Sequence, residues 1–180
     1  MNKDPEDNAY GVKFSEIHAI DLVDMDGDGI RDVVTGKRFW SHGRTGDPDR
    51  NDAAVLYWFR LSRGANGSVD FVPYLIDSES GVGTQVVAAD LNGDSLPDVV
   101  VGNKRGTFVH LHGKKTVTRE EWEQAQPKRY RVRRSRLGLF SAPPLTENRA
   151  RGQRNRPVEV RRCRVSPFRS RRIRPRILSR

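Results

Sequence analysis

The stretch VDMDGDGIRDVV, residues 23–34, places four aspartates within nine residues and then continues into an apolar, β-branched pair. The aspartates occupy positions 1, 3, 5 and 9 of a loop: Asp24, Asp26, Asp28 and Asp32. Gly27 and Gly29 allow this loop to bend tightly. Carboxylates this close repel one another unless a positive charge lies among them. The stretch therefore predicts a partner that neutralises it.

The same pattern returns 66 residues further along the chain. The segment VAADLNGDSLPDVVVGNK, residues 87–104, aligns without a gap with DLVDMDGDGIRDVVTGKR, residues 21–38. The alignment preserves Gly27 as Gly93, Gly36 as Gly102 and the Val-Val pair. Of the loop's acidic positions, Asp90, Asp94 and Asp98 are retained, and Asn92 replaces an aspartate. Similarity at a fixed spacing indicates two copies of one structural unit.

A calcium ion fits the donor chemistry of these loops. Hard dications such as Ca²⁺ bind about six to eight oxygen ligands, and carboxylates at alternate positions of a tight loop supply them. In the first loop the carbonyl of Ile30, at position 7, would complete the protein's share. The helix-loop-helix calcium hand requires Glu at position 12, where these loops carry Thr35 and Val101. We therefore predict calcium loops within β-hairpins.

Short segments rich in β-branched and aromatic residues surround each loop and predict strands. The predicted strands cover residues 18–23, 32–40, 54–62, 69–77, 84–89, 98–103 and 107–112, with a hairpin turn at RGANG, residues 63–67. The expected fold is all-β, a meander of about four antiparallel strands per repeat. Such a meander has exposed edges and a half-covered face, which favours stacking against like units.

The chain changes character after the last predicted strand. Thr118 and Glu121 form a capping box for a short helix that Pro127 ends. Residues 129–180 contain 18 arginines, no lysine and two acidic residues, a net charge of +16, whereas residues 1–128 contain 15 basic and 21 acidic residues. We expect a β-repeat domain at 1–128 and a disordered, Arg-rich tail at 129–180.

Two explanations of the Arg-rich tail remain open. Clustered arginines bind nucleic acid electrostatically, so a basic nucleic-acid-binding protein is the alternative function. The abrupt loss of lysine also fits a shift into an unintended reading frame of GC-rich DNA. The single cysteine, Cys163, lies in this tail and excludes an intramolecular disulfide.

The two loops resemble the D-x-D-G-D-G-x-x-D loops of the FG-GAP/VCBS repeat family. The likeness extends over residues 15–113, where TGKRFWSHG and VVVGNKRGTFVHLHG are similar to repeat proteins of planctomycete-type bacteria. The resemblance implies calcium-stabilised, propeller-type β-blades in a secreted or cell-surface protein. It assigns the calcium ligands to two sets, Asp24, Asp26, Asp28, the Ile30 carbonyl and Asp32, then Asp90, Asn92, Asp94, the Leu96 carbonyl and Asp98.

This chain departs from the family pattern in its second loop and in its number of repeats. Asn92 replaces a carboxylate and Ser95 replaces the glycine of position 6, so we expect the second site to be weaker. The serine would cost about 1 kcal/mol if that position needs a positive φ. Propellers close with about four to eight blades. The sequence supplies one complete blade and part of another, so we expect a fragment or an assembly with further blades.

A non-catalytic binding or scaffold module is the function that these patterns favour, with a protein or a surface glycan as partner. No nucleophile elbow, phosphate loop or zinc pattern occurs in the sequence. The N-terminus lacks the apolar core of a signal peptide, and no stretch approaches the roughly 18 apolar residues of a membrane span.

Three further features have alternative interpretations. His110 and His112 share one face of a strand and could chelate a transition metal, but without a third ligand we expect a surface pair. Four aromatic residues, Trp40, Tyr57, Trp58 and Phe59, could form a carbohydrate platform, but sheet packing is the favoured interpretation. His42 lies in a polar loop from which it could reach a ligand.

Overall fold

Two antiparallel β-sheets form most of the structure. The computed structural model describes residues 9–43, 45–47 and 49–130, and the backbone of 169–173. The first sheet contains β1 (Ile20–Val23), β2 (Asp32–Gly36), β3 (Leu56–Arg63) and β4 (Val69–Asp77), in that order. The second contains β5 (Val86–Ala89), β6 (Asp98–Asn103), β7 (Gly106–Leu111) and β8 (Arg169–Ile173). The predicted all-β class is confirmed.

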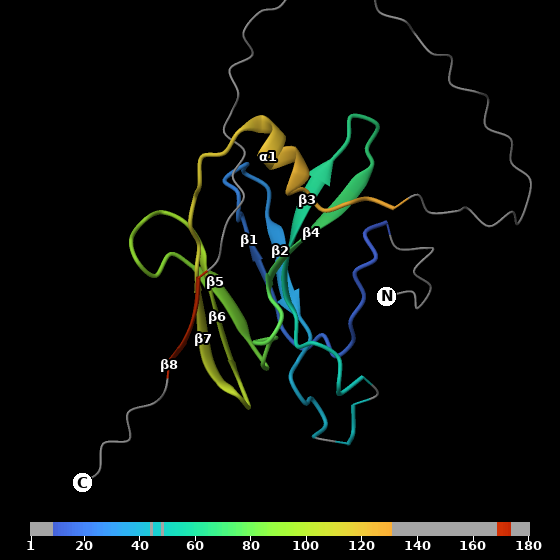
Figure 1. Cartoon of the computed structure of the whole chain (residues 1–180), viewed down its shortest axis with the longest axis vertical. Helices are drawn as coiled ribbons and strands as arrows, with labels where there is room; N and C mark the ends of the chain where they lie inside the picture. Colours follow the sequence, from blue (N-terminus) through green and yellow to red (C-terminus); the bar gives the residue numbers. More distant parts are fainter. Residues whose placement is uncertain (1–8, 44, 48, 131–168, 174–180) are drawn as a thin grey trace, which may run out of the picture.

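The hydrophobic core lies between the two sheets, which pack side by side (Figure 1). On the first sheet, Trp58 stacks on Tyr74 with their ring centroids 4.7 Å apart. The buried core residues are Ala19, Met25, Val34, Leu56, Trp58, Val82, Val86, Val99 and Val101. A polar link adds to this packing, because the carboxylate of Asp21 in β1 accepts a 2.7 Å hydrogen bond from the amide of Ala88 in β5.

The antiparallel connections separate the two ends of the molecule. Both aspartate loops lie at the end that carries the helix α1 (Arg119–Gln124), and the long β2–β3 connection, residues 37–55, lies at the opposite end (Figure 1). The predicted capping box of Thr118 and Glu121 is present at the start of α1. After α1, Gln126 accepts a 2.7 Å hydrogen bond from the hydroxyl of Tyr74, which ties this segment to β4.

The sequence does not predict β8. Its backbone pairs antiparallel with β7, from Thr107 opposite Ile173 to Leu111 opposite Arg169. This pairing covers an edge that would otherwise present unpaired amides and carbonyls. The charged sequence of this region has no alternating apolar pattern that would predict a strand. Pairing with the edge of β7 makes it a strand. The rest of the predicted disordered tail, from residue 131 onward, lies outside the described residues.

The predicted surface position of His110 and His112 is wrong. Both side chains are buried, and His110 pairs on the core side of β7 with Val99 of β6. Burial lowers the pKa of both imidazoles and so favours their neutral forms. Among the described residues, neither histidine belongs to a group of three candidate metal ligands. Their polarity suggested the surface, but the strand's register decides which face they occupy.

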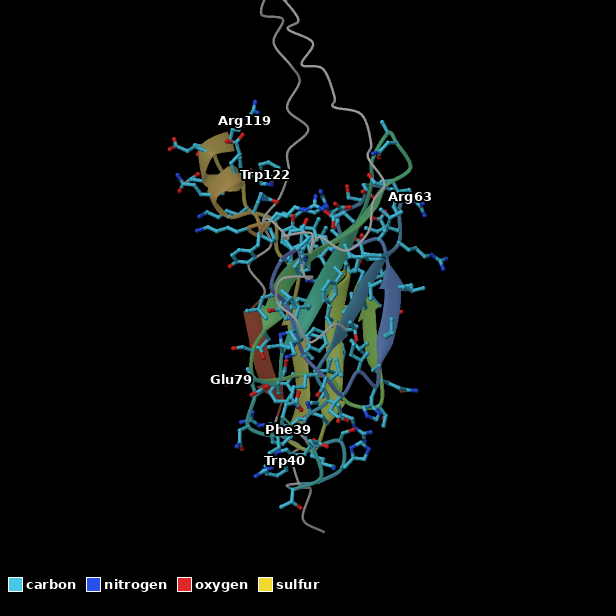
Figure 2. All side chains as sticks on the ribbon, turned by 90° about the vertical axis from the view of Figure 1, so that its right-hand side faces the viewer. Phe39, Trp40, Arg63, Glu79, Arg119 and Trp122 are labelled. Atoms are coloured by element: carbon cyan, nitrogen blue, oxygen red, sulfur yellow. The ribbon has the colours of Figure 1, made fainter. Side chains whose placement is uncertain are left out.

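Aromatic packing is confirmed for three of the four residues considered as a carbohydrate platform. Trp58 and Phe59 are buried, and Tyr57 stacks on Phe14 with a centroid separation of 5.8 Å. Trp40 instead lies in the β2–β3 connection, stacked on Phe39 at 4.5 Å, at one end of the molecule (Figure 2). Among the described residues, no helix has the length and apolar character needed to cross a membrane.

Candidate metal centre

Asp24 organises the first aspartate loop around its own side chain. One carboxylate oxygen accepts hydrogen bonds from the amides of Gly27, at 2.7 Å, and Asp28, at 3.1 Å. The other accepts from the amide of Gly29, at 2.8 Å. Both glycines have a positive φ, 80° for Gly27 and 87° for Gly29, which a glycine adopts without steric cost. The aspartate and glycine spacing therefore produces this tight turn locally.

Three carboxylates converge in this loop. One oxygen from each of Asp24, Asp26 and Asp28 lies within 4.8 Å of the other two. Burial raises the pKa of Asp26, and the neighbouring charge of Asp28 raises it further. Arg60 of β3 forms an ion pair with this loop, with its guanidinium 3.7 Å from Asp26. Arg60 is partly exposed and pairs with one of the three carboxylates, whose oxygen donors suit a hard dication such as Ca²⁺.

The second loop repeats the geometry of the first. Asp90 accepts hydrogen bonds from the amides of Gly93, at 2.7 Å, and Asp94, at 3.2 Å, through one oxygen, and from Ser95, at 2.9 Å, through the other. The amide of Ser95 holds the pKa of Asp90 below its ordinary value. Asn92 donates to Asp94 at 3.1 Å, so this pair is attractive where the first loop has two carboxylates.

Ser95, at position 6 of the second loop, has the positive φ that was considered for this position from the alignment of the two loops. Ser95 has a φ of 66°, and Gly29 at the equivalent position has 87°. The left-handed conformation favours glycine, because a Cβ atom there crowds the backbone. The second loop therefore adopts the same turn at a cost that the first loop avoids.

The residues at position 7 lie beside the carboxylate of position 5 in both loops. The amide of Ile30 donates to Asp28 at 2.8 Å, and the amide of Leu96 donates to Asp94 at 2.9 Å. These two residues are the ones whose carbonyls the family resemblance assigns to calcium. The structure thus brings positions 1, 3, 5 and 7 into one turn.

The aspartates at position 9 are placed differently. Asp32 is buried, and its two oxygens accept hydrogen bonds from the amide of Met25, at 3.1 Å, and of Leu61, at 2.8 Å. Burial raises the pKa of Asp32, against the opposing effect of these amides. Asp32 is not part of the group of three ligand atoms found among the described residues.

Asp98 repeats this arrangement in the second sheet. It is buried and accepts from the amides of Leu91, at 3.1 Å, and His112, at 2.7 Å. Each position-9 carboxylate therefore connects the start of its loop to a later segment of the same sheet. A structural role as a hydrogen-bond acceptor is visible at both positions.

The comparison with protein families matches residues 24–101 to the FG-GAP-like repeat. The chain carries an FG-GAP-like repeat region. The match begins at the first aspartate of the first loop and ends within β6, so it includes both loops and the strands between them. It confirms the family that the loops resemble. The comparisons with curated proteins and with solved structures found no significant match.

A second group of candidate ligands lies outside the two aspartate loops. It consists of Glu16, His18 and His42, of which the sequence pattern singled out only His42. Glu16 and His18 precede β1, and His42 belongs to the β2–β3 connection. No fixed spacing links these positions, because the folding back of the connection brings them together.

Proposed function

We propose that residues 1–128 form a calcium-stabilised β-repeat module that serves as a binding or scaffold domain without catalytic activity. The observation that carries this proposal is the convergence of three carboxylates in a turn that the chain builds twice, 66 residues apart. The FG-GAP-like region supports the repeat-module part of the proposal, because such repeats are generally non-catalytic binding modules.

Calcium would have a structural role in this module. When bound, it would supply the positive charge that Asp24, Asp26 and Asp28 lack. These ligands all belong to the loop between β1 and β2, so the ion would hold that hairpin end rather than present an open position to a substrate. The second loop, with one carboxylate fewer among its equivalent positions, would bind more weakly.

The outer face of the first sheet supports a propeller-type assembly. One face of this sheet is covered by the second sheet, while apolar side chains remain exposed on the other. The large exposed side chains are Ile20 and Leu22 on β1 and Phe71 and Leu75 on β4. We assign this face to a further β-sheet of the same repeat type, in an extracellular or surface protein whose partner is a protein or a glycan.

A thermal unfolding series in calcium tests the proposal on the full chain. The melting temperature should rise with Ca²⁺, because a ligand that binds only the folded state adds about 2.7 kcal/mol at 100 times its Kd. For a chain of this size that corresponds to roughly 5–10 °C. Asp28→Asn should reduce the rise, and combination with Asp94→Asn should abolish it. Asp52→Asn, an exposed aspartate outside both loops, is the matched control.

The outcome that contradicts the proposal is equally specific. A melting temperature that does not respond to millimolar Ca²⁺, or that rises equally in the double variant, would exclude the aspartate loops as the calcium sites. A rise of the same size with Mg²⁺ would show a general charge effect in place of a calcium site.

A further inference from the structure

A second cluster of metal-ligating side chains lies at the end of the molecule opposite the aspartate loops. A carboxylate oxygen of Glu16 lies 3.3 Å from Nε2 of His18 and 3.5 Å from Nδ1 of His42. One ligand atom from each of the three side chains lies within 4.8 Å of the others. We infer that Glu16, His18 and His42 form a zinc site, separate from the calcium loops and independent of their function.

The donor atoms favour zinc over calcium. Two imidazoles and one carboxylate suit Zn²⁺ and related transition metals, whereas Ca²⁺ requires oxygen ligands. Zinc bonds to nitrogen and oxygen are about 2.0–2.2 Å long, so two ligand atoms of a tetrahedral site lie about 3.3–3.5 Å apart. The two separations measured from Glu16 already have these values. The ion would therefore enter with little rearrangement of the carboxylate.

The fourth position of this site would be open to solvent. The side chain of His42 is 62% exposed and that of His18 is 33% exposed, whereas that of Glu16 is only 12% exposed. The protein thus supplies three ligands from a partly covered carboxylate and two accessible imidazoles. Water would complete the tetrahedron, an arrangement typical of zinc sites that keep one exchangeable position.

Asp47 holds the His42 side of the cluster in place. This buried carboxylate accepts hydrogen bonds from the amides of Ser41 and His42, both at 2.8 Å, and from Nδ1 of His42 at 3.1 Å. The Nδ1 atom of His42 therefore lies beside two carboxylates, those of Glu16 and Asp47. Zinc at this nitrogen would replace its hydrogen bond to Asp47, while the amides of Ser41 and His42 would still hold the Asp47 carboxylate.

The backbone around the cluster is held in an unusual conformation. Glu16 and Trp40 are non-glycine residues with positive φ, 58° and 48°. The carbonyl of Glu16 also accepts a 2.9 Å hydrogen bond from the amide of Arg38, which joins the segment before β1 to the end of β2. Left-handed non-glycine residues persist where the surrounding structure imposes them, and they concentrate at ligand sites.

Two neighbours compete with a metal at His18. A guanidinium nitrogen of Arg38 lies 3.4 Å from Nδ1, and the hydroxyl of Ser41 contacts Nε2. A donor at Nδ1 favours the tautomer with its hydrogen on Nε2, whereas zinc at Nε2 requires the tautomer with its hydrogen on Nδ1. The positive charge of Arg38 also opposes a second cation. Substitution of Arg38 should therefore strengthen zinc binding, whereas substitution of a ligand should weaken it.

Calorimetric titration of the full chain with Zn²⁺, in saturating Ca²⁺ to occupy the aspartate loops, tests this site. We expect one zinc per chain. His42→Gln and Glu16→Gln should each lower the affinity more than about tenfold, because even outer-shell partners contribute about 10–100-fold. Arg38→Gln should raise the affinity, because its amide oxygen can accept the Nδ1 proton of His18. Cys163→Ser is the control for binding through the chain's single thiol and should change nothing.

Three results would overturn the inference: no saturable zinc binding, binding that His42→Gln and Glu16→Gln leave unchanged, or binding lost in Cys163→Ser. If Glu16→Gln unfolds the chain, the exposed His42 still provides the test, with its fold checked by the melting temperature. The calcium response of the same variants should be normal, so failure of the zinc site and failure of the calcium loops are distinguishable.

Discussion

At the scale of single residues, Ser95 shows how hydrogen bonding imposes a backbone conformation on an unfavourable side chain. Its amide donates to Asp90 at 2.9 Å, as the amide of Gly29 donates to Asp24 at 2.8 Å. Both residues consequently have a positive φ, 66° for Ser95 and 87° for Gly29. The hydrogen bond to Asp90 imposes the positive φ, and this conformation costs the serine about 1 kcal/mol in steric crowding.

Replacement of this serine should stabilise the domain. We expect Ser95→Gly to raise the free energy of unfolding by up to about 1 kcal/mol and to strengthen calcium binding by the second loop. Ser95→Ala is the matched control, because it removes the hydroxyl but keeps the Cβ atom and should give no such gain. Urea unfolding with and without Ca²⁺ measures both effects. A gain shared by Ser95→Ala would assign the cost to the hydroxyl and not to φ.

At the scale of elements, the buried position-9 aspartates join each loop to its sheet. Asp98 accepts one amide from Leu91, inside the loop, and one from His112, just after β7. Asp32 does the same with Met25 and Leu61. Both carboxylates use two oxygens for two backbone amides, so each amide of this buried junction has its acceptor.

Asp98→Asn should therefore destabilise the second sheet with or without calcium. The asparagine offers one acceptor oxygen where the carboxylate offers two, so one amide loses its partner, which costs about 1–3 kcal/mol. Urea unfolding should show this loss in the presence of a calcium chelator and also in saturating Ca²⁺. Asp94→Asn, at a more exposed position of the same loop, should instead lose stability mainly in calcium. A calcium-dependent effect alone for Asp98→Asn would identify it as an ion ligand.

At the scale of the whole molecule, the packing of the two sheets encloses a titratable group. His110 is buried on the core side of β7, and burial lowers its pKa, although the charge of Asp77 partly opposes this. The unfolded chain has an imidazole pKa of about 6.5. As the pH falls below that value, the unfolded state binds protons that the folded state excludes, so stability present above about pH 6.5 is lost.

Replacement of His110 by an apolar residue should reduce this acid sensitivity. We expect His110→Leu to lose less stability than the parent chain between pH 7 and pH 5, measured by urea unfolding at each pH. At pH 8 the histidine is neutral in both the folded and the unfolded state. The difference in the free energy of unfolding between His110→Leu and the parent chain at that pH therefore reports packing alone and serves as the reference. Part of the dependence of stability on pH should remain in His110→Leu, because burial also lowers the pKa of His112. If stability depends on pH as steeply in His110→Leu as in the parent chain, His110 is not the source of the acid sensitivity.

Local chemistry made much of this molecule predictable. The Asp and Gly spacing defined both loops, the β-branched segments predicted the strands β1 to β7, and the capping box of Thr118 and Glu121 marked α1. Each of these features depends on residues within a few positions of one another. The strand β8 was missed because it depends on the edge of β7, and the burial of His110 was missed because it depends on which face of the second sheet packs against the first.

The sequence by itself determined the two aspartate turns and the all-β repeat that contains them, because side chains that bond to their own loop need no distant partner. Only the tertiary structure decided which side chains meet across the chain. It joined Glu16 and His18 to His42, and it placed the position-9 aspartates against distant amides. The physical reason is that such contacts require the packed sheets and the long β2–β3 connection to bring remote segments together.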